Sequence, residues 1–141
     1  MTVGLIGNGP ASNAPNVGVQ VLGVMRVLPR RPMDRFVYSL EVKRDWAEQV
    51  EYEAPALLTE VALRRTRQAA KNVFEALGCR DLARIDFRVR DGVPYFIEAN
   101  PLPGLAPGTS DLVILAQGYG IEYPDLIRRI LHAALTRVGL K

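Results

Sequence analysis

Residues 83–104 read A-R-I-D-F-R-V-R-D-G-V-P-Y-F-I-E-A-N-P-L-P-G, and this stretch decides the fold class of the chain. Apolar and polar residues alternate from Ala83 to Arg90, which predicts a strand with one buried face. A second strand-like run follows from Val93 to Asn100. Asp91 and Gly92 between the two runs predict a tight turn, because glycine tolerates the left-handed backbone that hairpin loops require. The stretch therefore predicts an antiparallel hairpin.

The length of the turn decides which side chains of the hairpin share a face. A two-residue loop would pair Asp86 with Ile97 and turn Glu98 to the opposite face. A three-residue loop that begins at Arg90 would pair Arg84 with Glu98 instead. We expect the three-residue loop, because the other register buries Glu98 among apolar side chains without a partner. In the expected register one face carries Asp86, Phe96, Glu98 and Asn100.

This polar face has the composition of a nucleotide–metal site. Asp86 and Glu98 supply carboxylates and Asn100 supplies an amide oxygen. Magnesium prefers such oxygens, usually takes one or two carboxylates from the protein, and completes its shell with water and substrate phosphates. The alternative is a solvated sheet face with Arg84–Glu98 and Arg88–Asp86 ion pairs, which contribute little to stability. Spacing alone favours this alternative, since short motifs often match by chance.

Four segments of the chain together resemble the C-terminal part of the D-alanine–D-alanine ligases, which are ATP-grasp carboxylate–amine ligases. The segments are A-R-I-D-F, P-Y-F-I-E-A-N-P-L-P-G, S-D-L and Y-P-D-L-I-R-R-I-L. The resemblance runs from Thr2 to the last predicted helix. It implies an α+β fold, an antiparallel sheet with helices packed on one face, as the C-terminal lobe of an ATP-grasp fold. It also implies that residues 1–141 are a single C-terminal subdomain, without the N-terminal substrate domain and the other ATP-binding lobe.

The resemblance implies ATP and Mg²⁺ (or Mn²⁺) as cofactors and assigns roles to the hairpin residues. Asp86 would hold one metal ion, Glu98 would bridge two, and Asn100 would hold the second. Arg84 and the backbone amide of Gly104 would stabilise the oxyanion that develops in the reaction, which requires donors aimed at that charge. Without the resemblance, Gly104 reads as an ordinary turn glycine.

Two further residues take their roles only from the resemblance. Lys43 matches a lysine that contacts phosphate, and its alternative is a solvent-facing charge. Many members place a tyrosine beside that lysine, whereas this chain has Arg44, which leaves the acceptor substrate open. Ser110 is the nearest match to a serine that touches the carboxylate of the second substrate. The interval from Asn100 is one residue longer here than in those ligases, so a plain helix-capping role for Ser110 stays open.

Composition bounds the partners and the compartment. The chain has 141 residues, the length of one ordinary domain, and a formal net charge of +3 without a long basic run. The mild charge therefore predicts neither nucleic acid nor membrane as partner, whereas the resemblance implies a small, amino-acid-like substrate. The single cysteine, Cys79, excludes an internal disulfide, fits a reducing compartment and is expected to be a buried thiol without a catalytic role. No secretory signal or membrane span is visible, and we expect a cytoplasmic protein; the resemblance implies a role in peptidoglycan biosynthesis.

The remaining sequence predicts three strands and three helices. The strands are expected at residues 2–6, 20–28 and 36–42, with a loop at residues 10–18. A helix from about Glu60 to Leu77 has Thr59 as a plausible N-cap and Gly78 just past its end. Ser110 or Thr109 is expected to cap a helix that reaches Gly118, and Pro124 to open the last helix. His132, the only histidine, is expected to be structural.

Two other classes of function remain open. One is a catalytically silent nucleotide-binding remnant that keeps the metal face. The other is an interaction module, and possible homodimer, in which the strand at residues 2–6 leaves an exposed edge that invites pairing.

Overall fold

The computed structural model describes residues 1–9, 18–30 and 50–140 of the chain, and these form one five-stranded antiparallel sheet with three helices. The strands are arranged in the order β3-β2-β1-β4-β5. Their bounds are β1 Thr2–Asn8, β2 Gln20–Pro29, β3 Val50–Glu53, β4 Arg80–Arg90 and β5 Val93–Asn100. The helices are α3 Glu60–Ala76, α4 Asp111–Gly118 and α5 Tyr123–Arg137. The predicted α+β class with an antiparallel sheet is confirmed.

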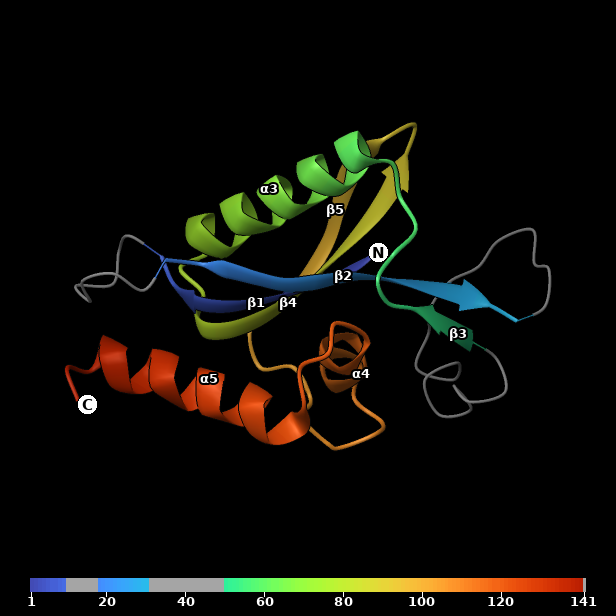
Figure 1. The fold of residues 1–141 in the computed structure, drawn as a ribbon. Helices are drawn as coiled ribbons and strands as arrows, with labels where there is room; N and C mark the ends of the chain where they lie inside the picture. Colours follow the sequence, from blue (N-terminus) through green and yellow to red (C-terminus); the bar gives the residue numbers. More distant parts are fainter. Residues whose placement is uncertain (10–17, 31–49, 141) are drawn as a thin grey trace.

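Helices cover both faces of the sheet, so the expectation that they pack on one face is corrected. Helix α3 lies on one face, and α4 and α5 lie on the other (Figure 1). The reason is that the sheet has apolar residues on both sides. Ile85 packs in the cluster that contains Phe74 of α3, whereas Leu82 on the same strand packs in the cluster that contains Leu112 of α4. Two buried faces need two layers of helix.

The hairpin between β4 and β5 differs from the expected register. Its turn has two residues, Asp91 and Gly92, both with positive φ (52° and 73°), and Arg90 pairs with Val93. The three-residue loop and the Arg84–Glu98 pairing are therefore wrong. A bulge between the Phe87 and Asp86 positions then shifts the register by one residue and leaves Ile97 as the additional residue of β5.

The bulge decides which residues of the hairpin share a face. Beyond it Asp86 lies opposite Glu98, and Arg84 opposite Asn100. The predicted grouping of Asp86, Glu98 and Asn100 is thus found, with Asp86 and Glu98 directly opposite instead of diagonal. Phe96 lies before the bulge, opposite Phe87, and the two rings meet edge to face at 6.2 Å. The prediction that Phe96 shares the face of Asp86 is therefore wrong.

Strand β1 is the centre of the sheet and not its edge. It pairs with β2 on one side and β4 on the other, and every residue from Thr2 to Asn8 is buried. The expectation of an exposed edge at residues 2–6 is wrong, because β2 and β4 both bond to this strand. The interaction-module alternative loses the feature on which it was based.

Several local predictions are confirmed. Thr59 is the N-cap of α3, where its hydroxyl accepts a hydrogen bond from the Ala62 amide, and Gly78 follows the helix with φ 64°. Cys79 is buried. His132, in contrast, is exposed on α5 and does not belong to the core. The strand expected at residues 36–42, Lys43, and most of the loop expected at residues 10–18 lie outside the described residues.

A close contact between β2 and the end of α4 holds the second helical layer to the sheet. The Tyr119 hydroxyl accepts a hydrogen bond from the Val24 amide and donates one to the Val24 carbonyl, both at 3.0 Å. Gly23 lies beneath the Tyr119 ring, and a Cβ atom at this position would come within 2.3 Å of it. Only glycine leaves room for the ring at this point of β2.

We expect Gly23→Ala to lower the free energy of unfolding by about 2 kcal/mol, because the added methyl group displaces the Tyr119 ring from the sheet. Urea denaturation measures the change. Gly18→Ala is the matched control, since a Cβ at that exposed position of the same chain segment meets nothing within 4 Å. Equal stability of the two variants would contradict the close packing of Tyr119 on β2.

Candidate functional site

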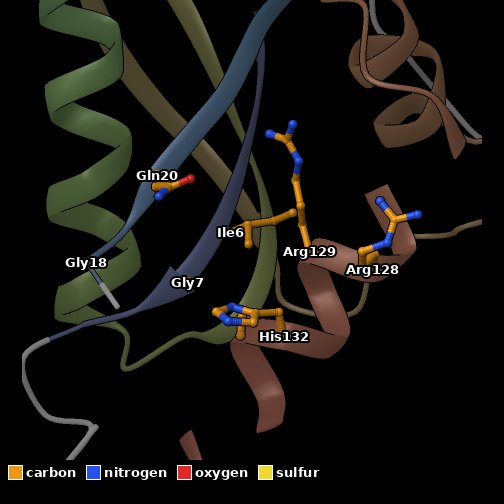
Figure 2. Close-up of a pocket in the computed structure, with 8 residues that line it drawn as sticks. Ile6, Gly7, Gly18, Gln20, Arg128, Arg129 and His132 are labelled. Carbon is orange, nitrogen blue, oxygen red and sulfur yellow. The ribbon is translucent and has the colours of Figure 1, made fainter. Parts of the chain in front are cut away.

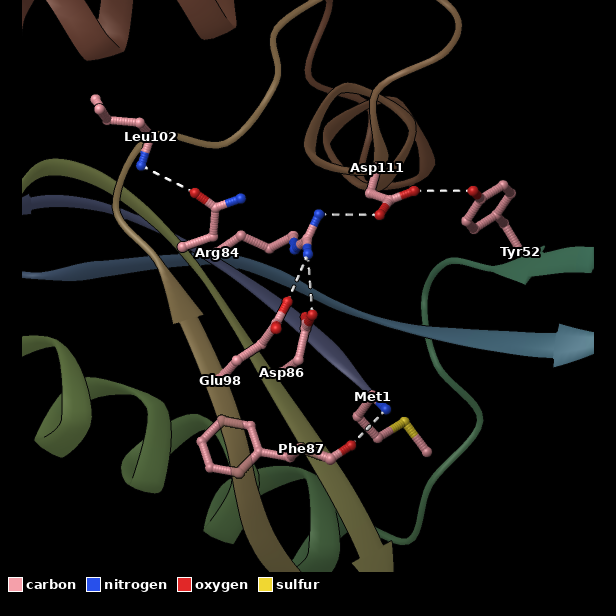
Figure 3. Close-up of polar contacts among 9 residues, drawn as sticks. Met1, Tyr52, Arg84, Asp86, Phe87, Glu98, Leu102 and Asp111 are labelled. Carbon is pink, nitrogen blue, oxygen red and sulfur yellow. Dashed lines mark hydrogen bonds and ion pairs between the residues drawn. The ribbon is translucent and has the colours of Figure 1, made fainter. Parts of the chain in front are cut away.

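A buried arginine lies at the centre of the polar face. Arg84 is only 7% exposed, and its guanidinium is shared by three carboxylates from three elements (Figure 3). Nη1 donates to Asp111 Oδ2 at 3.0 Å. Nη2 donates to Asp86 Oδ2 at 3.0 Å and to Glu98 Oε1 at 3.3 Å. Such charge-assisted hydrogen bonds are stronger than neutral ones and fix the guanidinium in one orientation.

The local structure explains how these side chains converge. Arg84 and Asp86 are two apart on β4, so both point to the α4 side of the sheet. Glu98 reaches the same side from β5, because it lies directly opposite Asp86 after the bulge. Asp111 is the first residue of α4, where the helix dipole favours a negative charge.

The polar cluster extends beyond the carboxylates. The Tyr52 hydroxyl of β3 donates to Asp111 Oδ1 at 2.8 Å. A continuous chain of hydrogen bonds therefore crosses the sheet from Tyr52 on β3, through Asp111 and Arg84, to Asp86 and Glu98 (Figure 3). Neither Tyr52 nor Asp111 was identified as a site residue from the sequence. The segment S-D-L contains Asp111, but from the sequence it predicts only the start of a helix, and the sequence around Tyr52 carries no comparable signal.

The cluster has more negative than positive charge. One guanidinium faces three carboxylates, which leaves a surplus of two negative charges when all are ionised. Burial raises the pKa of the Asp86 carboxyl, and the neighbouring Glu98 adds to this effect, while Arg84 opposes it. Burial alone would lower the pKa of Arg84, but Asp86 and Asp111 outweigh burial and raise it. Arg84 therefore stays charged, and a further cation beside Asp86 would relieve the repulsion.

The residues present fit a magnesium ion. Asp86 Oδ1 is buried and makes no hydrogen bond to any described residue, so it is available as a ligand. Glu98 points to the same side, and its side chain is 56% exposed. Asn100 is opposite Arg84, with its Oδ1 accepting from the Leu102 amide at 3.1 Å. The described part of the chain holds no group of three or more His, Cys, Asp or Glu residues that could bind a metal ion. Magnesium takes only a few of its ligands from the protein, and two carboxylates and an amide oxygen are enough for that part of its coordination shell.

The other predicted site residues lie in the loop after β5 or outside the described chain. Gly104 and Ser110 are neighbours: a Cβ at position 104 would come within 2.8 Å of Ser110 Oγ. Ser110 is the N-cap residue of α4, but its hydroxyl accepts from the Ala106 amide at 2.9 Å and makes no capping hydrogen bond. Lys43 lies outside the described residues. The structure thus groups Arg84, Asp86, Glu98 and Asn100, and it separately groups Gly104 with Ser110.

Away from the Arg84 cluster, a hollow lies between α5 and the part of the sheet where β1 ends and β2 begins. Ile6, Gly7 and His132 are among the residues that line it, together with Arg128 and Arg129 (Figure 2). Both arginines are bonded to Asp125 at 2.8 Å on their own helix. Asp125 neutralises only part of their positive charge, and none of the described residues that line the hollow carries a carboxylate, so the hollow offers less chemistry than the Arg84 cluster.

Over the residues that the structure describes, we find no helix both long enough and apolar enough to cross a membrane.

Comparison with known proteins shows the family to which the chain belongs. Residues 2–132 match the family model described as D-ala D-ala ligase C-terminus, and the chain belongs to this family. It is 36% identical over 116 residues to a D-alanine–D-alanine ligase of Anaeromyxobacter dehalogenans, covering 82% of this chain and 36% of the relative. It is 36% identical over 124 residues to a D-alanine–D-alanine ligase of Thermotoga sp., covering 88% and 39%.

A solved structure shows the same fold. The crystal structure of D-alanine–D-alanine ligase from Bacillus anthracis complexed with ATP superposes with a TM-score of 0.69 at 25% identity, covering 98% of this chain and 38% of that one. The chain thus spans a little over a third of the length of the relatives that it matches.

We expect Arg84→Met to lower the free energy of unfolding at pH 7 by about 3 kcal/mol, because it leaves buried carboxylates without their counter-charge. Urea denaturation measures the change. Arg88→Met, four residues further along the same strand at an exposed position, is the control and should change stability by less than about 0.5 kcal/mol. Equal losses in the two variants would show that Arg84 is not the hub of the cluster.

Proposed function

We propose that this chain is the ATP- and metal-binding catalytic part of a ligase of the D-alanine–D-alanine type, which joins a carboxylate to an amine with hydrolysis of ATP. One observation carries the proposal. In a chain of this family, Asp86, Glu98 and Asn100 project from adjacent strands to the same side of the sheet, around the buried Arg84. The proposed substrates are small and amino-acid-like, and the proposed setting is peptidoglycan biosynthesis in the cytoplasm.

The proposed reaction has two steps. A substrate carboxylate oxygen attacks the γ-phosphorus of ATP, and ADP leaves with the electron pair of the broken P–O bond. The amine of the second substrate then attacks the carbonyl carbon, and the tetrahedral species collapses with loss of phosphate and a proton. Asp86, Glu98 and Asn100 would hold Mg²⁺, which, when bound, neutralises charge on the phosphate oxygens.

The residues of this chain have defined tasks in that scheme. Arg84 carries a fixed positive charge and a planar set of donors, which suits a phosphate or an oxyanion. The Gly104 amide would be the second donor, and the absence of a side chain there lets a ligand approach the backbone. Lys43 would contact phosphate, and Ser110 would touch the carboxylate of the second substrate. All four assignments follow the family resemblance and are proposals for this chain.

A silent nucleotide-binding remnant is the second candidate. Metal binding is common to both candidates, and only turnover distinguishes them.

We expect the chain to bind Mn²⁺, used as a spectroscopic substitute for Mg²⁺, and Glu98→Gln to weaken this binding at least about tenfold, which corresponds to about 1.4 kcal/mol. Electron paramagnetic resonance of free Mn²⁺ measures the affinity. The fold should be unaffected, because Glu98 is more than half exposed. Glu75→Gln, an exposed glutamate on α3, is the control. Equal affinity of the two variants would rule out Glu98 as a ligand.

Turnover is tested in a chimera that carries residues 2–132 in place of the corresponding part of the Thermotoga ligase. With ATP, Mg²⁺ and D-alanine it should release phosphate and form the dipeptide. Arg84→Lys should lower kcat about 100-fold, because the planar donor set aimed at the oxyanion is lost, while KM for ATP changes much less. A folded chimera that binds ATP but forms no dipeptide would favour the silent remnant.

A further inference from the structure

Of the three carboxylates that are bonded to Arg84, Asp111 is the one that belongs to a helix and not to the β4–β5 hairpin. Asp86 and Glu98 belong to the hairpin that carries the proposed metal ligands, whereas Asp111 begins α4. The Asp111 side chain is 9% exposed, compared with 19% for Asp86 and 56% for Glu98. It is therefore the least accessible of the three to a cation arriving from solvent.

The two ends of the guanidinium face different partners. Nη1 is bonded to Asp111, and Nη2 is bonded to Asp86 and Glu98. A divalent cation held by Asp86 and Glu98 would compete with Nη2 for the same carboxylates and would repel it. Nη1 would be unaffected, because its partner lies on the other side of the guanidinium (Figure 3).

The second oxygens of the carboxylates show the same asymmetry. Asp111 Oδ1 is fixed by the Tyr52 hydroxyl at 2.8 Å. Asp86 Oδ1 makes no hydrogen bond to any described residue. Asp111 is thus held from both sides as a fixed anchor, while Asp86 keeps an oxygen available for a further ligand.

We propose that Asp111, steadied by Tyr52, is a positioning residue that retains Arg84 beside the metal ligands when a divalent cation binds. Asp86 and Glu98 would hold the cation, and Arg84 would stay bonded to Asp111, with its Nη2 free to donate to a phosphate or an oxyanion. Without Asp111, the two metal ligands would be the only remaining carboxylates bonded to this guanidinium among the described residues. Arg84 would then close on them and compete with the cation. The inference rests on the proposed function of the site.

The test measures Mn²⁺ affinity of the 141-residue chain by electron paramagnetic resonance. Asp111→Asn should weaken Mn²⁺ binding about fivefold, within the range of coupling between contacting residues. Asp111→Glu should restore most of the affinity. Asp125→Asn is the matched control, because Asp125 is also an acidic residue in a first helical turn that pairs with arginine, but on α5. It should leave the affinity unchanged.

A double-mutant cycle separates positioning from simple charge. In an Arg84→Met background, Asp111→Asn should no longer weaken Mn²⁺ binding, because its effect passes through the guanidinium. An equal weakening in both backgrounds would overturn the proposal and show that Asp111 acts only by its own charge. Tyr52→Phe tests the same coupling without changing a charge, in case the Asp111 variant does not fold. It removes the hydrogen bond to Asp111 and should weaken Mn²⁺ binding about twofold, in the wild-type background only.

The outcomes also separate this inference from the proposed function. If the wild-type chain binds no Mn²⁺, or binds it independently of Glu98, then the proposed function fails and the inference fails with it. If binding depends on Glu98 but the cycle shows no coupling between Asp111 and Arg84, only the inference fails.

Discussion

A single buried guanidinium shared by three carboxylates is the interaction on which the site depends. Arg84 cannot lose its charge, and three carboxylates are bonded to it. The cluster therefore has more negative than positive charge. Burying charges is costly unless each is paired and hydrogen-bonded. Strands β4 and β5, helix α4 and, through Tyr52, strand β3 all contribute to that pairing. The surplus negative charge gives a divalent cation a physical reason to bind there.

The one-residue bulge in β5 links the packing of the core to the geometry of the site. Before the bulge, Phe96 lies opposite Phe87 on the α3 side. After it, Glu98 lies opposite Asp86 on the α4 side. A regular two-residue hairpin would have placed Glu98 on the apolar face, as the alternation of side chains requires. The extra residue resolves this conflict: it allows the tight Asp91-Gly92 turn and a polar face that faces α4 at the same time.

The sequence predicted much of this arrangement and missed the rest for definable reasons. Alternation and the turn residues predicted the hairpin, and the need to keep Glu98 off the apolar face predicted the shared face of Asp86, Glu98 and Asn100. The predicted three-residue loop was wrong, since a two-residue turn and a bulge in β5 produce this shared face instead. A bulge depends on how two strands pair and not on either strand alone. The central place of β1 and the second helical layer also depend on tertiary packing. Asp111 and Tyr52 were missed since they join the site from α4 and β3, far from the hairpin in sequence. Lys43 lies outside the described residues, and its role stays a prediction.

The most direct measurement of the central claim is the anomalous diffraction of Mn²⁺ in crystals of this chain. We predict a manganese peak in contact with carboxylate oxygens of both Asp86 and Glu98, with Arg84 still hydrogen-bonded to Asp111 and released from the two metal ligands. A peak elsewhere on the surface, or an Arg84 that stays closed on Asp86 and Glu98 at saturating Mn²⁺, would contradict it.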